Sequence, residues 1–173
     1  MKKNIFYLII LLFFTFIFTI FYIGLDKPNF YTPKELKNKS LEEFTSTELF
    51  SNEQFSSNNI IENNKFTLIN IWSSWCVPCR LEHSVLMDLS EKTDLNIVGL
   101  NYKDKKNNAI KFLNELGNPF SKILTDPDGI ISISLGAYGV PETLLLNNKS
   151  KIIRKYIGPL TKENILEIIK IIK

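Results

Sequence analysis

The sequence predicts an α/β domain, with a mixed central sheet flanked by helices, preceded by one N-terminal transmembrane helix. The first observation behind this prediction is an uncharged, mostly apolar run from Ile5 to Leu25, because about 20 apolar residues suffice to cross a bilayer as a helix. The second is the alternation of strand-like and helix-like segments from Phe66 onward, which is typical of a sheet covered by helices. The chain has 173 residues, 45% of them hydrophobic, which is enough for one domain with a proper core.

The N-terminal run carries a signal for its orientation. Lys2 and Lys3 precede it, and the first charge after it is Asp26. Because positive charge stays in the cytoplasm, we expect the body of the protein on the far side of the membrane. A cleaved signal peptide is the alternative, but its apolar region would be shorter, and residues 21–25 do not show the pattern of small residues at positions −3 and −1 of a cleavage site. We therefore expect an uncleaved anchor over residues 1–25.

The next segment, residues 26–62, is polar, and its two prolines disfavour a helix near its start. We expect a tether and N-terminal extension there, in which Ser40–Phe44 and Glu48–Phe50 add a short strand or turn to the body. The main domain is then expected over residues 63–173. The formal charge of the chain is +3, and two of the positive charges precede the apolar run, so a nearly neutral body argues against nucleic acid as a partner.

The main domain is predicted to alternate strands with helices and to finish with a hairpin and a helix. The expected strands are 66–72, 95–101, 120–124, 143–146 and 151–157. We expect one helix that begins near residue 76, two more over 108–116 and 130–135, and a final helix capped by Thr161. The expected turns are 126–129 and 147–150. In the first helix, Leu81, Val85 and Leu89 recur at a spacing of four and are expected on one buried face. Gly117 is a suitable end for the second helix.

The chain's only two cysteines stand together in Trp75-Cys76-Val77-Pro78-Cys79, after the first apolar strand. A cysteine at a helix N-terminus has its thiol pKa lowered by unpaired N–H groups and by the helix dipole, and it becomes the attacking thiolate. The second cysteine is one turn away, close enough to close a disulfide ring. We therefore assign Cys76 as nucleophile and Cys79 as resolving thiol, with Pro78 stiffening the first helical turn.

A zinc site and a static disulfide are the alternative interpretations of the cysteines. A structural zinc site needs four ligands, and His83 is the only histidine that could join the two cysteines, so we expect no metal. A static disulfide rarely closes so tight a loop and gives no role to Trp75 or Pro78. His83, four residues after Cys79, is expected to be a partly exposed helix residue rather than a ligand or a base.

Three strings place the chain near a known family. They are NIWSSWCVPCRLEH at 70–83, GLNYKDKKNNAIKFLNELGNPF at 99–120 and DPDGIISISLGAYGVPETLLL at 126–146. Together they closely resemble the thioredoxin-like cytochrome c maturation proteins called CcmG or DsbE. The resemblance covers about residues 66–160 and the anchor, and it implies a thioredoxin-like fold.

The resemblance also implies roles for particular residues. It implies that Cys76 is exposed and Cys79 less so, and that Trp75 and Pro78 support the redox-active Cys76–Cys79 disulfide. Local sequence alone favours an ordinary trans peptide bond at Pro141, whereas the resemblance implies a cis-proline that faces the disulfide and lies beside the docked substrate.

Acidic residues complete the implied site. Glu82 and Glu142 match acidic positions that the family places near the active site, where an acid close to the resolving cysteine can accept its proton. The alternative for each is a solvated surface residue, and we favour Glu142 as the functional one. Asn70 stands where thioredoxin carries a buried Asp, and because an amide cannot accept a proton, the glutamates are expected to take over that task.

In function, the resemblance implies a membrane-anchored, periplasm-facing disulfide reductase without a cofactor. It would keep apocytochrome c, or the maturation partner CcmH, reduced for haem attachment, and would receive electrons from an inner-membrane reductase of the CcdA or DsbD type. A reductant with the same chemistry for another periplasmic substrate, such as a copper-delivery protein, is one alternative. A non-catalytic holdase for apocytochrome c, whose disulfide only staples a loop, is the other.

Overall fold

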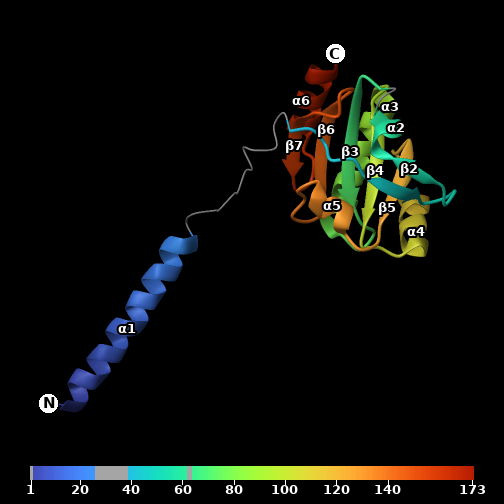
Figure 1. The fold of residues 1–173 in the computed structure, drawn as a ribbon. Helices are drawn as coiled ribbons and strands as arrows, with labels where there is room; N and C mark the ends of the chain where they lie inside the picture. The colour runs from blue at the N-terminus through green and yellow to red at the C-terminus, as the bar shows by residue number, and fades with distance from the viewer. Residues whose placement is uncertain (1, 26–38, 62–63) are drawn as a thin grey trace. The chain divides into compact units, whose positions relative to one another are not determined.

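A computed structural model of the chain describes residues 2–25, 39–61 and 64–173. The chain divides into two units, residues 1–34 and residues 35–173. The first contains α1, Lys2–Leu25 (Figure 1). Its segment Asn4–Tyr22 is long and apolar enough to cross a membrane. It is therefore a candidate membrane span, as the sequence predicts. Of the tether and N-terminal extension expected over residues 26–62, residues 26–38 lie outside the described residues.

The second unit is built on one mixed, seven-stranded sheet with the order β2-β1-β5-β4-β3-β6-β7 (Figure 1). The strands are β1 Thr45–Glu48, β2 Gln54–Ser56, β3 Phe66–Trp72, β4 Asn96–Tyr102, β5 Lys122–Asp126, β6 Glu142–Asn147 and β7 Ile152–Ile157. Strands β3, β4 and β5 run parallel to one another, whereas β6, β7, β1 and β2 each join antiparallel. Central β3 therefore has a parallel neighbour on one side and an antiparallel neighbour on the other.

Helices cover both faces of this sheet. They are α2 Ser57–Ile61, α3 Val77–Lys92, α4 Lys106–Leu116, α5 Ile130–Ser134 and α6 Lys162–Ile172. One core joins α3, α4 and α6 to the sheet, and its strand residues include Leu68 and Trp72 of β3. The other core joins α2 and α5 to the opposite face, through Ile69 and Ile71 of the same strand. Alternate β3 side chains thus face opposite layers, as the pleat of a strand requires.

The helix and turn signals in the sequence mostly hold. Gly117 ends α4 at a φ of 88°, with its N–H donating to the Leu113 carbonyl at 2.9 Å. Thr161 and Asn164 form a capping box at the start of α6. The strand expected over 120–124 lies two residues later, and the extension expected over 26–62 contributes β1, β2 and α2 to the second unit. The division of the chain into domains remains a prediction.

The buried face predicted for α3 is confirmed at Leu89, which is 1% exposed, but it is wrong at Leu81. Leu81 is 72% exposed, and the buried residues include Glu82, His83 and Leu86, one position further along the helix. The cause is that two polar side chains occupy the inner face and make hydrogen bonds there. The apolar spacing alone therefore identified only part of the inner face.

Candidate redox site

The two cysteines lie where β3 leads into α3. They are bonded as a disulfide, with their Cα atoms 5.2 Å apart. Cys76 is the N-cap of α3, and the Cys79 N–H donates a hydrogen bond to the Cys76 Sγ at 3.1 Å. Pro78 lies in the first turn of α3. The backbone N–H groups of a first turn have no partner within the helix, so the missing N–H of proline costs no helical hydrogen bond there. A helix N-terminus whose N–H points at a sulfur stabilises the thiolate form of that sulfur. The assignment of Cys76 as the nucleophile requires such a stabilised thiolate.

Both sulfurs are covered in this disulfide-bonded form. Cys76 is 4% exposed and Cys79 is 2% exposed, so the expectation of an exposed Cys76 is wrong for this state. Val140 packs against the buried cluster that contains both cysteines. The neighbouring Trp75 and Val77 side chains are exposed. A partner must therefore reach a recessed sulfur bordered by apolar side chains.

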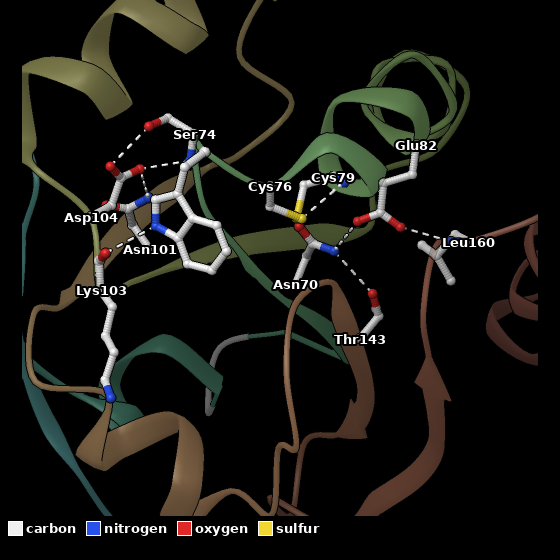
Figure 2. The surroundings of a disulfide bond; sticks show 11 residues. Asn70, Ser74, Cys76, Cys79, Glu82, Asn101, Lys103, Asp104, Thr143 and Leu160 are labelled. Atoms are coloured by element: carbon white, nitrogen blue, oxygen red, sulfur yellow. Dashed lines mark hydrogen bonds between the residues drawn. A yellow bond between two sulfur atoms is a disulfide. The ribbon is translucent and has the colours of Figure 1, made fainter. Parts of the chain in front are cut away.

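A buried polar group lies beside the disulfide on the α3 face of the sheet (Figure 2). The Asn70 Nδ2 donates to the Glu82 Oε1 at 2.9 Å and to the Thr143 Oγ1 at 3.0 Å. The Leu160 N–H donates to the Glu82 Oε2 at 2.7 Å. Burial raises the pKa of Glu82, and this effect outweighs the lowering by the hydrogen bonds from Leu160 and Asn70. Because Glu82 is three residues after Cys79 on a helix, the two side chains share one face.

Glu142 occupies a different environment, directly after Pro141, whose peptide bond is cis as the resemblance implies. Its Oε1 accepts hydrogen bonds from the Tyr138 and Gly139 N–H groups at 2.6 and 3.1 Å. Its Oε2 lies 2.7 Å from the Lys155 Nζ, and both side chains are buried. Glu142 therefore holds the loop that leads into the cis-proline, in an ion pair shielded from water.

The alternative of solvated surface residues is wrong for both glutamates, because Glu82 is 2% exposed and Glu142 is 1% exposed. The structure brings Glu82 to the helix face of Cys79 and ties Glu142 to Lys155. The preference for Glu142 as the proton-accepting acid thus has less geometric support than the assignment of that task to Glu82.

A loop for which the sequence predicts no role borders the site on the other side (Figure 2). The Asp104 carboxylate accepts hydrogen bonds from the Ser74 N–H at 2.6 Å and the Ser74 hydroxyl at 2.8 Å. The Trp75 indole N–H donates to the Lys103 carbonyl at 3.0 Å. Lys103 and Asp104 belong to the string GLNYKD, so the signal was present in the sequence but carried no assigned role.

His83 is not the partly exposed residue expected from the sequence. It is 3% exposed, its Nε2–H donates to the Gly117 carbonyl at 3.0 Å, and its ring meets Phe112 edge-on at 4.9 Å between centroids. Burial lowers the pKa of His83. Within residues 2–25, 39–61 and 64–173, no three His, Cys, Asp or Glu side chains gather in a way that could hold a metal ion.

Comparisons with known proteins agree with this geometry. The family model described as Redoxin matches residues 36–169. The thiol:disulfide interchange protein CycY of Rhizobium leguminosarum bv. viciae is 48% identical over 103 residues, which are 60% of this chain and 55% of CycY. The chain thus matches about half the length of that relative. The probable thiol:disulfide interchange protein DsbE-2 of Pasteurella multocida is 35% identical over 162 residues, which are 94% of this chain and 85% of that protein.

A solved structure confirms the thioredoxin-like fold. It is that of a putative thiol:disulfide interchange protein DsbE from Chlorobium tepidum, which superposes with a TM-score of 0.68 at 21% identity. The superposition covers 79% of this chain and 98% of that one. At this level of identity the likeness concerns the fold alone.

Proposed function

The chain belongs to the Redoxin family, in its DsbE branch of thiol–disulfide oxidoreductases, and on that premise we propose that it is a membrane-anchored reductant of protein disulfides in the periplasm. The observation that carries the proposal is the Cys76 sulfur at the N-terminus of α3, receiving the Cys79 N–H at 3.1 Å. This placement supports a thiolate at Cys76 and a resolving thiol one turn along. The candidate span in α1, preceded by Lys2 and Lys3, supports an inner-membrane anchor with the catalytic unit outside the cytoplasm.

The proposed reaction passes one electron pair to the partner. The Cys76 thiolate attacks one sulfur of the partner's disulfide, that S–S bond breaks, and the released partner thiolate takes a proton from water. A mixed disulfide remains. Cys79 then loses its proton and attacks the Cys76 sulfur. The mixed disulfide breaks, the second partner thiolate leaves and is protonated, and the protein ends with its Cys76–Cys79 disulfide.

Glu82 is the proposed acceptor of the Cys79 proton. A raised pKa makes its carboxylate a stronger base than an ordinary surface glutamate. Its place one helical turn after Cys79 supports this role, and Asn70 beside it holds the carboxylate but cannot take a proton itself. Trp75, Pro78 and the cis Pro141 are proposed to support the site and the docked partner.

Among partners, we propose apocytochrome c or a CcmH-type maturation protein as the substrate, and a CcdA- or DsbD-type membrane reductase as the electron donor. The family resemblance in residues 66–160 supports this choice. A reductant for a copper-delivery protein with the same chemistry, and a holdase for apocytochrome c, are the alternatives that an experiment must separate.

Trapping on the full-length, membrane-bound chain separates them. Cys79→Ser should accumulate a mixed disulfide with the substrate through Cys76, whereas the matched variant Cys76→Ser should trap nothing. Mass spectrometry of the trapped species then identifies an apocytochrome c, a CcmH-type protein or a copper-delivery protein. If both variants still support formation of holocytochrome c, the holdase alternative is correct and the proposed activity is wrong.

The direction of electron flow has its own measurement. A periplasmic reductant should have a reduction potential nearer that of thioredoxin, about −270 mV, than that of DsbA, about −120 mV. Equilibration of the Cys76–Cys79 pair with glutathione buffers gives the value. A potential close to that of DsbA would contradict the proposed role as a reductant.

A further inference from the structure

The two residues that precede Cys76 are held by a loop from a different part of the chain (Figure 2). Ser74 gives both its N–H and its hydroxyl to Asp104, one to each carboxylate oxygen. The Trp75 indole N–H is bonded to the carbonyl of Lys103, the residue just before Asp104. Three hydrogen bonds thus join the approach to the disulfide to residues about thirty positions later in the sequence.

This loop is itself firmly placed at the ends of two parallel strands. Asp104 also accepts hydrogen bonds from the Asn101 Nδ2 at 3.1 Å and from the Lys105 N–H at 2.8 Å. The Lys103 N–H donates to the Asp126 carbonyl at 2.9 Å, which connects the end of β4 to the end of β5. Lys103 has a φ of 43°, a left-handed conformation that is uncommon for a residue with a side chain. The backbone therefore turns sharply where it meets Trp75.

The position of Trp75 depends on these bonds. Its side chain is 57% exposed, so packing alone does not fix the ring. The indole hydrogen bond sets the ring's direction, and the Ser74 bonds set the backbone that carries it. The next residue is Cys76, whose N–H donates to the Ser73 carbonyl at 3.2 Å in a tight turn. A movement of the Ser74 backbone would therefore be passed on directly to the nucleophile.

The Asp104 carboxylate is held by hydrogen bonds on both of its oxygens. Together the oxygens receive four, three from N–H groups and one from the Ser74 hydroxyl. These bonds come from Ser74 and from the loop of Asp104 itself, so its action on Cys76 runs through the Ser74 backbone.

We propose that Asp104 is a positioning residue for the redox reaction, which holds Ser74 and Trp75 so that Cys76 meets a partner disulfide in the productive geometry. This inference rests on the proposed function, because it assigns Asp104 a part in the same thiol–disulfide exchange. A displacement of the attacking group by about 1 Å lowers a rate on the order of a hundredfold. Loosening the loop should therefore affect the rate far more than its distance from the sulfur suggests.

The test compares Asp104→Ala with the wild type, both as full-length chains in detergent. The second-order rate constant for reduction of oxidised glutathione is measured from pH 5 to pH 9, a range that spans the titration of thiols with lowered pKa values. We expect the plateau rate to fall on the order of tenfold to a hundredfold, with the apparent pKa of the profile unchanged. Acrylamide quenching should increase for Trp75, the exposed indole, since Trp72 is 2% exposed and out of reach.

Two further variants make the test specific. Ser74→Ala keeps the Asp104 charge and removes one hydrogen bond, so it should lower the plateau in the same direction but less. Ser74→Ala also provides the test of the proposal if Asp104→Ala does not fold. Asp88→Ala removes an equivalent carboxylate from an exposed ion pair with Lys92 on α3 and should leave rate and quenching unchanged.

The proposal is wrong if Asp104→Ala reacts at the wild-type rate, or if Asp88→Ala slows equally. It is also wrong if the apparent pKa shifts while the plateau stays constant, because Asp104 would then act through its charge. A wild type that does not reduce oxidised glutathione would instead count against the proposed function. The quenching comparison would still show whether Asp104 holds Trp75.

Discussion

The Asn70 amide donates a hydrogen bond to the Glu82 carboxylate at 2.9 Å, and so joins the central strand β3 to helix α3 beside the disulfide (Figure 2). Both side chains are buried. The same amide nitrogen also donates to the Thr143 hydroxyl, and this second hydrogen bond fixes the amide with its nitrogen toward Glu82. The neutral residue of this pair is on the strand, and the ionisable one is on the helix that carries both cysteines.

Glu82→Gln tests what the ionisable member does. If its carboxylate takes the proton of Cys79, the glutamine variant should resolve its mixed disulfide more slowly, by roughly a hundredfold or more, while the first attack by Cys76 stays nearly as fast. The mixed disulfide with glutathione, followed by mass spectrometry over time, reports both steps. Glu91→Gln, at an exposed position of the same helix, is the matched control. Resolution of Glu82→Gln at the wild-type rate would remove the proposed role.

The pH dependence of stability tests the burial of His83, the chain's only histidine. Burial lowers its pKa in the folded protein, so the unfolded chain binds the proton more readily. The contribution of neutral His83 to the free energy of unfolding is complete above the unfolded pKa of about 6.5 and is lost as the pH falls toward the folded pKa. The free energy of unfolding then changes by at most about 1.4 kcal/mol per pH unit.

Urea unfolding of wild type and His83→Gln between pH 7.5 and pH 4.5 measures this difference. The stability of the wild type relative to the variant should decrease on acidification. The difference between the two proteins is the quantity to use, because the raised pKa of Glu82 acts in the opposite sense in both: its stability contribution is present below the unfolded pKa and lost as the pH rises. A constant difference across this range would contradict the buried, neutral His83.

Much of this arrangement can be predicted from the sequence, and the features that could not be predicted have physical reasons. The motif around Cys76 places a thiol at a helix start because local rules decide strand ends, caps and turns. The face of α3 could be predicted only in part, because buried Glu82 and His83 resemble surface residues until their partners are known. Those partners are Leu160 and Gly117, both distant in sequence.

The same reasoning applies to the loop at Asp104. Its hydrogen bonds to Ser74 cross thirty residues, and no local pattern indicates that pairing. Strands β1 and β2 lie in the polar extension, for which the sequence predicts only a short strand or turn at 40–44 and 48–50, because four-residue and three-residue strands give too few alternating positions to recognise. Long-range pairing with β5, rather than local propensity, forms them.

The ion pair of Glu142 and Lys155 should be structural. Lys155→Met leaves the buried Glu142 carboxylate without its counter-charge, and loss of one partner of a buried pair typically lowers the free energy of unfolding by about 3–5 kcal/mol. The double variant Lys155→Met/Glu142→Gln should recover part of this loss, because no charge remains buried. Urea unfolding of the two single variants and the double variant forms the required cycle. Additive effects would show that the two side chains do not interact.

Close packing behind the site makes Gly99 a sensitive position, and this can be tested by adding one methyl group. A Cβ at Gly99 would lie 2.7 Å from the Trp72 indole nitrogen and 3.0 Å from the Phe120 ring, in a core where those two rings stack at 5.6 Å between centroids. Gly99→Ala should therefore lower the free energy of unfolding by about 1–3 kcal/mol, as overpacking does. Gly139→Ala is the matched control, because its Cβ would meet nothing within 4 Å, and it should change stability by no more than about 0.5 kcal/mol. Urea unfolding followed by tryptophan fluorescence measures both. Equal stability of the two variants would contradict the tight contact of Gly99 with Trp72.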